Sequence, residues 1–227
     1  MSVVKGRSFC PSCNKQIKWY NNIPLLSFII LKARCIECST KINIKYFLVE
    51  LISGLNFVLI FYLFGISLTT LLFFILSICF IIIFFIDLKH FIIPNELTYP
   101  LMVIGFLKSF VPNLNYHLFP NFINSLIGGI FGYVIIWLII FIYKKLRNKE
   151  GMGLGDAKLL SVIGFWFGWI SIPFVIFFSS FVALISVIPD LIKNKKKLSS
   201  QIPFGPFIII GNLIFLFLFD QIKLFLN

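Results

Sequence analysis

The sequence predicts an all-α protein, a polytopic transmembrane helical bundle that follows an N-terminal cytoplasmic zinc-binding loop. Of its 227 residues, 59% are hydrophobic and only 12% are charged, which excludes an ordinary water-soluble domain. Apolar stretches of about 20 residues, the length that crosses a bilayer as a helix, recur after the first 45 residues. We therefore expect a cytoplasmic loop at residues 1–45 and a membrane domain at residues 46–227.

The formal charge of +12 is a guide to topology rather than a sign of nucleic-acid binding. Of the 20 Lys and Arg residues, 18 lie in residues 1–45, at Lys89, in residues 144–158 and in residues 193–197. Because cytoplasmic loops collect Lys and Arg, these tracts are predicted to face the cytoplasm together. Each apolar stretch between two tracts must then cross the membrane an even number of times.

This parity gives the first four of about seven apolar segments. Residues 51–86 carry no charged side chain and are long enough for two spans, with a break at Gly65. Residues 97–111 and residues 122–143 form the next pair and flank a polar stretch. Both pairs are predicted to return to the cytoplasmic face.

The remaining segments are shorter. Residues 159–189 are uncharged and are expected to bend between Gly168 and Pro173. Because 31 residues cannot supply two full spans, one helix must be short, kinked or extended past Lys158. Residues 206–219 form the last crossing and can continue past Asp220.

Four cysteines in the N-terminal loop predict a metal site. They form two C-x2-C pairs separated by 21 residues: Cys10, Cys13, Cys35 and Cys38. Four thiolates grouped in this way suit tetrahedral zinc with a structural role, because no ligand position is left open for water. Disulfide bonds are the alternative, which a reducing cytoplasm disfavours.

Two acidic residues lie at the ends of apolar runs on the predicted cytoplasmic face. Asp87 ends one run, and Asp156 begins another after the glycine-rich stretch that contains Gly153 and Gly155. Two carboxylates held close together cannot both ionise easily, so one keeps a proton while the other activates water, as in aspartic peptidases. Glycines permit close approach of backbone and substrate. The pair is therefore the candidate catalytic site.

Other interpretations stay open at this level. Either aspartate alone reads as a solvated or helix-capping residue at a membrane boundary. A transporter that couples protons or cations through the two carboxylates is one alternative function, although its acids would more naturally lie near the bilayer midplane. A zinc-dependent membrane scaffold without catalysis is another.

Three further features are candidates for shaping the substrate site or its loops. Glu50 lies where the N-terminal loop enters the first span, and Lys158 follows Asp156 by two positions, where it either tunes the acid or marks the inner face. The stretch Pro203–Pro206 is expected to shape re-entry into the membrane.

Several strings, taken in order, resemble the type IV prepilin peptidase family, the bifunctional leader peptidases and N-methyltransferases of bacterial pilus and type II secretion systems. These strings are Cys10–Cys13 (CPSC), Asn22–Ser27 (NIPLLS), Arg34–Cys38 (RCIEC), Leu48–Glu50 (LVE), Ile86–Leu88 (IDL), Ile93–Thr98 (IPNELT), Gly151–Leu160 (GMGLGDAKLL) and Pro203–Pro206 (PFGP). The ordered set is far more specific than any one of its members.

The resemblance implies catalytic roles for Asp87 and Asp156 and zinc binding by the four cysteines. It implies a substrate as well, the basic leader of a pilin-like precursor, cut at the cytoplasmic face of the bacterial inner membrane. Methylation of the new N-terminus with S-adenosylmethionine would follow. The expected partners are prepilin-like proteins and membrane lipid, and not nucleic acid.

Two departures from the family concern the N-terminal region. Family members usually begin with a further transmembrane helix, which would make the seven segments eight. They also usually have aspartate where this chain has Asn21. Because the methyltransferase function is associated with this region, the resemblance supports proteolysis more firmly than methylation.

A related peptidase that cuts archaeal-type preflagellins is a further alternative within the peptidase class. The four-cysteine loop argues against it.

Overall fold

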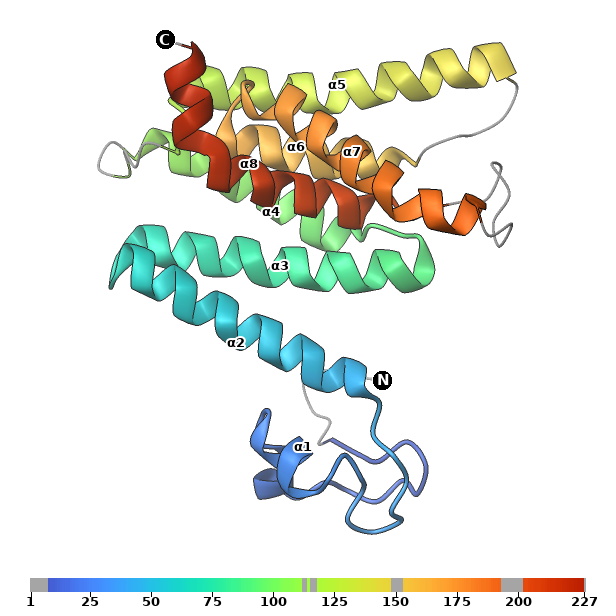
Figure 1. Ribbon diagram of the computed structural model, residues 1–227. Coiled ribbons are helices and arrows are strands. Elements are labelled where there is room, and N and C mark those ends of the chain that lie inside the picture. Colours follow the sequence, from blue (N-terminus) through green and yellow to red (C-terminus); the bar gives the residue numbers. More distant parts are fainter. Residues whose placement is uncertain (1–7, 112–113, 115–117, 148–152, 193–201, 227) are drawn as a thin grey trace. The chain divides into compact units, whose positions relative to one another are not determined.

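The computed structural model describes residues 8–111, 114, 118–147, 153–192 and 202–226. Across these residues the secondary structure is helical, with two isolated bridges in the cysteine loop (Figure 1). The all-α prediction is confirmed. The chain divides into two compact units, an N-terminal unit at Met1–Thr70 and a C-terminal unit at Leu71–Asn227. The boundary predicted between residues 45 and 46 stays a prediction.

The N-terminal unit joins the cysteine loop to one long helix. The loop contains a 3-10 turn, η1 (Trp19–Asn22), and a short helix, α1 (Leu26–Ile30). Helix α2 (Ile44–Phe64) begins after Asn43, whose side chain accepts a hydrogen bond from the N–H of Lys45 at 2.9 Å. It ends at Gly65, whose φ of +58° suits glycine, and the predicted break there is confirmed.

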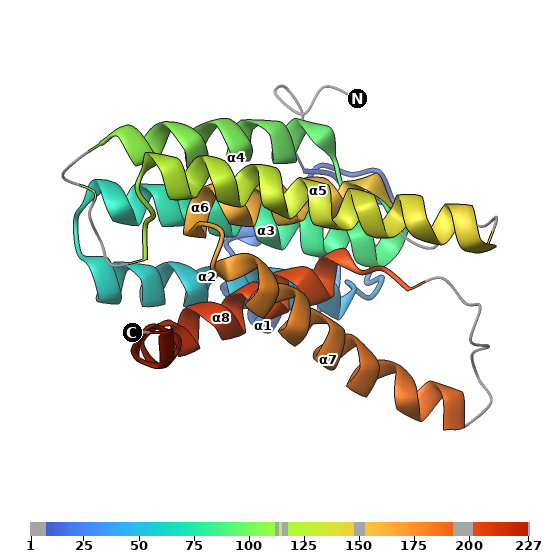
Figure 2. The same cartoon turned by 90° about the horizontal axis from the view of Figure 1, so that it is seen from above.

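The C-terminal unit holds six helices within the described residues. Figure 2 shows them from above: α3 (Leu68–His90), α4 (Asn95–Leu107) with the 3-10 turn η2 (Lys108–Phe110), α5 (Phe122–Arg147), α6 (Leu154–Phe167), α7 (Ser171–Ile192) and α8 (Gly205–Leu226). Helix α6 ends at Phe167, directly before Gly168, where the sequence predicted a bend. Of the alternatives that the sequence left open for this region, α6 is both short and extended past Lys158.

Five of the described helices are long and apolar enough to cross a membrane, namely α2, α3, α5, α7 and α8. These helices suit an integral membrane protein. The other two predicted segments also form helices, but α4 has 13 residues and α6 has 14. At 1.5 Å per residue each is only about 20 Å long, short of a bilayer core. Seven crossing segments are therefore not confirmed, because two of the seven helices are too short.

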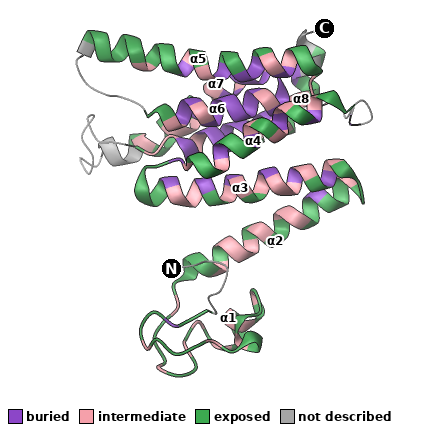
Figure 3. Cartoon of the chain, turned by 180° about the vertical axis from the view of Figure 1, so that it is seen from behind, coloured by how far each residue is buried: buried purple, intermediate pink, exposed green. Residues whose placement is uncertain are grey.

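Helix α6 is the core of the C-terminal unit. Figure 3 shows it as the most continuously buried helix, and it contacts α4, α5, α7 and α8. Its contact with α5 is made through glycines. A Cβ at Gly128 would lie 2.5 Å from the carbonyl oxygen of Gly164, so only glycine allows this approach. The hydroxyl of Ser161 donates to the carbonyl oxygen of Gly129 at 2.8 Å, which fixes the register of the two helices.

Two further contacts fasten α6 to its neighbours. The indole N–H of Trp166 donates to the carbonyl oxygen of Leu101 in α4 at 2.8 Å, and both residues are fully buried. Phe73 of α3 stacks with Phe167, with the ring centroids 6.3 Å apart. These contacts hold the C-terminal end of α6 against α4 and against the first half of α3. The aspartates lie at the opposite ends of α6 and α3.

Candidate functional site

Asp87 and Asp156 come together in the C-terminal unit. Asp87 lies in the last turn of α3, and Asp156 lies in the first turn of α6. Their side chains are 4% and 8% exposed, and they are close enough for the charges of the two carboxylates to repel each other. Two buried carboxylates at this range favour a state in which one of them keeps a proton. The structure thus brings the two predicted acids together, and their catalytic role stays a prediction.

A backbone amide from a third helix reaches the pair. The N–H of Gly205, the first residue of α8, donates to Oδ2 of Asp87 at 3.0 Å, and the bond is buried. A Cβ at Gly205 would lie 2.7 Å from that oxygen, which is closer than van der Waals contact allows. The stretch that the sequence suggested only as a re-entry turn therefore touches the candidate site.

Ile93 fills the space between the two glycines that flank the aspartates. It lies in the connection between α3 and α4 and is 8% exposed. A Cβ at Gly155 would lie 3.0 Å from the Cβ of Ile93, and a Cβ at Gly205 would lie 3.1 Å from its Cδ1. The site is thus closed on this side by an apolar side chain.

Of the other residues predicted to shape the site, Gly153 is the extended residue that precedes α6, and a Cβ there would lie 3.8 Å from Oδ2 of Asp156. Gly151 and Met152, which open the same string, lie outside the described residues. Lys158 donates from Nζ to Oδ1 of Asn95 at 2.7 Å and lies over the ring of Tyr99. The Lys158 side chain therefore connects α6 to α4 through a hydrogen bond.

The four cysteines of the N-terminal unit form one cluster. Their Sγ atoms all lie within 4.8 Å of one another, and Sγ of Cys10 lies 3.8 Å from Sγ of Cys38. A disulfide bond needs about 2.05 Å. Four thiolates about 2.3 Å from a central zinc ion would stand about 3.8 Å apart, so the donor set fits a metal ion.

The two C-x2-C pairs have the same local structure. In each, the first cysteine accepts a hydrogen bond from the N–H four residues later, at 2.9 Å from Asn14 to Cys10 and at 2.9 Å from Ser39 to Cys35. Asn14 and Ser39 both have positive φ, at 53° and 55°. This pair of matching turns points all four thiols inward. The Thr40 hydroxyl beside Cys38 lowers the pKa of that thiol to about 6, which favours the thiolate that binds metal.

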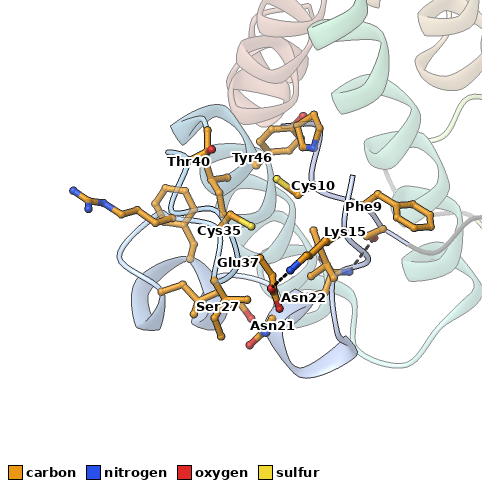
Figure 4. Close-up of a pocket in the computed structure, with 18 of the residues that line it drawn as sticks. Phe9, Cys10, Lys15, Asn21, Asn22, Ser27, Cys35, Glu37, Thr40 and Tyr46 are labelled. Atoms are coloured by element: carbon orange, nitrogen blue, oxygen red, sulfur yellow. Dashed lines mark hydrogen bonds and ion pairs between the residues drawn. The ribbon is translucent and has the colours of Figure 1, made fainter. Parts of the chain in front are cut away.

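A pocket of about 550 Å³ lies beside the cysteine cluster in the same unit (Figure 4). Asn21, Asn22, Ser27 and Tyr46 line it, and Lys15 and Glu37 form an ion pair of 2.7 Å at its rim. Glu50 lines it as well. Its Oε2 accepts the N–H of Leu25 at 2.8 Å, and this bond ties the loop to α2.

Sequence reasoning found the aspartates and the cysteines but missed Gly205 and Ile93 as neighbours of the acids. Both residues lie in strings that resemble the prepilin peptidase family, namely IPNELT and PFGP. The available signal was a glycine directly before a proline, since glycine permits the close approach of another group to the backbone. The partner of that glycine lies 118 positions away and is visible only in three dimensions.

Comparison with known proteins gives two family matches. The family model described as the type IV leader peptidase family matches residues 74–188, and the one described as the bacterial peptidase A24 N-terminal domain matches residues 1–64. No solved structure matches the chain significantly.

Several similar curated proteins are named prepilin leader peptidase/N-methyltransferase. The chain is 36% identical to the one of Aeromonas salmonicida (strain A449), over 97% of the chain and 74% of the relative. It is 34% identical to the one of Pseudomonas aeruginosa, with the same coverage. The relative in Neisseria gonorrhoeae is 36% identical over 82% of the chain and 64% of the relative.

Proposed function

The chain belongs to the type IV leader peptidase family, and on that basis we propose that it is a membrane-embedded aspartic endopeptidase that cleaves the basic leader from prepilin-like precursors. The observation that carries this proposal is the buried pair Asp87 and Asp156, brought together from α3 and α6. Peptide hydrolysis by two carboxylates needs such a pair, in which one is ionised and the other protonated.

The reaction follows from the protonation of the pair. The ionised carboxylate takes a proton from water, whose oxygen attacks the scissile carbonyl carbon, while the protonated carboxyl gives its proton to the carbonyl oxygen. The tetrahedral intermediate then collapses: the C–N bond breaks, the first carboxyl gives its proton to the leaving amine, and a hydroxyl of the intermediate returns a proton to the second carboxylate. The first aspartate is then ionised again and the second protonated again, so the pair is ready for another cycle. Burial of both groups strengthens these interactions.

The membrane location is part of the proposal. Five apolar helices support an integral membrane protein, and the clusters of Lys and Arg support a cytoplasmic N-terminal loop in the bacterial inner membrane. Asp87 and Asp156 lie at helix ends, which suits a peptide bond presented near the membrane surface. The transporter alternative gains no support, because its acids would lie in the middle of spans.

We further assign zinc to Cys10, Cys13, Cys35 and Cys38, on the strength of four thiols at tetrahedral spacing. All four positions are protein ligands, so the metal would fold the loop and take no part in hydrolysis. Because the loop is tied to α2 by Glu50, the metal would also hold the pocket walls in place.

Methylation of the new N-terminus is the second activity of the proposal, and the names of the relatives support it. S-adenosylmethionine supplies an electrophilic methyl group. Its size suits the pocket of about 550 Å³ in the N-terminal unit, where Asn21, Asn22 and Glu50 offer oxygen atoms to its hydroxyl and ammonium groups. The residues of this pocket would bind the donor and orient it toward the free amine.

Co-expression tests both activities. The chain is produced with a prepilin-like precursor, and the precursor is then analysed by mass spectrometry. Loss of the leader plus one methyl group is the expected result. Loss of the leader without methylation would contradict the proposed methyltransferase activity. An intact precursor would contradict the proposed peptidase activity.

A further inference from the structure

The N-terminus of α8 is built to present one particular donor to Asp87. The carbonyl oxygen of Phe204 accepts the N–H groups of Phe207 and Ile208, both at 3.0 Å. Pro206 has no N–H. The N–H of Gly205 is therefore the first donor of the helix, and it points at Oδ2 of Asp87 from 3.0 Å.

The same position has no room for a side chain. A Cβ at residue 205 would lie 2.7 Å from Oδ2 and 3.3 Å from Cγ of Asp87. The carboxylate would have to swing away, and the hydrogen bond would be lost with it. The N–H group of Gly205 makes the contact with Asp87, and the lack of a side chain at residue 205 leaves room for it.

This contact distinguishes the two acids of the pair. A hydrogen bond to an ionised oxygen is shorter and stronger than one to a neutral oxygen, and the positive end of α8 adds to the effect. Asp156 faces the negative charge of Asp87 from α6, which favours its protonated form. The side chain of Lys158, two positions after Asp156, donates to Asn95.

We infer that Gly205 is a positioning residue for the proposed peptidase reaction: its N–H holds Asp87 as the ionised acid, so that Asp87 is the base that deprotonates water and Asp156 the acid that protonates the carbonyl oxygen. This assignment rests on the proposed function. It gives the PFGP stretch a chemical role that neither its sequence nor the comparisons supply.

The test replaces Gly205 by Ala in the full chain, reconstituted in nanodiscs with a prepilin-like peptide. We expect kcat/KM to fall by about 10²-fold, the usual loss on removing a preorganised donor. We also expect the acid limb of the pH–rate profile to move to higher pH by about one unit, because the ionised base is no longer stabilised. A variant that merely folds less well would lose rate equally at every pH.

Two variants serve as controls. Gly54→Ala in α2, where a Cβ meets nothing within 4 Å, should match wild type in rate and profile. Ile93→Val removes the Cδ1 that a Cβ at residue 205 would approach to 3.1 Å, so the double variant Gly205→Ala/Ile93→Val relieves that contact alone. If the double variant recovers the wild-type rate, Gly205 serves packing against Ile93 and the inference is wrong.

The inference and the proposed function fail separately. If Asp87→Asn and Asp156→Asn still cleave at the wild-type rate, the peptidase mechanism itself is wrong. If both abolish cleavage while Gly205→Ala keeps the wild-type rate and acid limb, only the role of Gly205 is overturned.

Discussion

Gly128 of α5 and Gly164 of α6 touch backbone to backbone in the core of the C-terminal unit. A Cβ on Gly164 would overlap the carbonyl oxygen of Gly128, and one on Gly128 would lie 2.5 Å from the carbonyl oxygen of Gly164. This contact presses the short helix α6 against a long spanning helix. Because α6 carries Asp156 in its first turn, the packing also fixes one of the two acids.

Replacing Gly164 by Ala should therefore separate the two helices. Overpacking against rigid backbone is expected to cost at least about 2 kcal/mol of unfolding free energy. Reversible unfolding in mixed detergent micelles measures this. The matched substitution Gly54→Ala, which adds a methyl group in open space, should leave the unfolding midpoint unchanged. Equal midpoints for both variants would contradict the close packing.

Lys108 should be replaceable with a gain in stability. Its side chain is 4% exposed, and its Nζ lies 4.0 Å from the ring centroid of Phe119, with no hydrogen-bond partner among the described residues. Nζ also lies 5.6 Å from the ring centroid of Trp166. The free-energy cost of removing a buried ammonium group from water exceeds the stabilisation that these two rings provide. Lys108→Met should stabilise the chain by about 1 kcal/mol. A lower thermal midpoint would show that the amine has a stronger partner than Phe119.

Lys158 should behave in the opposite way, because its Nζ donates to Oδ1 of Asn95 at 2.7 Å. Lys158→Met and Asn95→Ala should each destabilise the chain, and the double variant should lose less than the sum. The expected coupling in a double-mutant cycle is about 0.5–1 kcal/mol. Strict additivity of the two losses would mean that the hydrogen bond contributes nothing to stability.

Metal content tests the cysteine cluster. Purified chain should carry one zinc ion per molecule by elemental analysis, and Cys35→Ser should lose it, since three thiolates bind far more weakly than four. Cys79→Ser changes the one cysteine outside the cluster and should keep the zinc. Full zinc content in Cys35→Ser, or none in the wild type, would contradict the assignment.

The elements that sequence predicted well are those set by local rules. The break at Gly65 and the turn at Gly168 both occur where glycine has positive φ, at 58° and 81°. The 31 uncharged residues available for two helices predicted that one helix would be short, kinked or extended past Lys158, and α6 is both short and extended. The turns of the cysteine cluster were likewise predictable, because the two cysteines of a C-x2-C pair are close enough along the chain for one turn to present both sulfurs to one ion.

The contacts that sequence did not predict join distant segments. Hydropathy gives seven apolar segments but not their tilt or burial, so it counts α4 and α6 as spans although each is only about 20 Å long. The partner of Lys158 is Asn95 on another helix, and the partner of Asp87 is a backbone N–H. Every residue except proline has a backbone N–H, so the sequence does not mark this donor. The only sequence feature of this contact is the glycine that leaves room for it.

The most direct measurement of the central claim compares cleavage rates of three Asp→Asn variants on a prepilin-like peptide. Asp87→Asn and Asp156→Asn should each lower the rate by at least about 10³-fold, because each removes a proton-transfer group. Asp220→Asn, an exposed acid of α8, should cleave at the wild-type rate. If either variant of the buried pair cleaves as fast as the wild type, the two-aspartate mechanism is wrong.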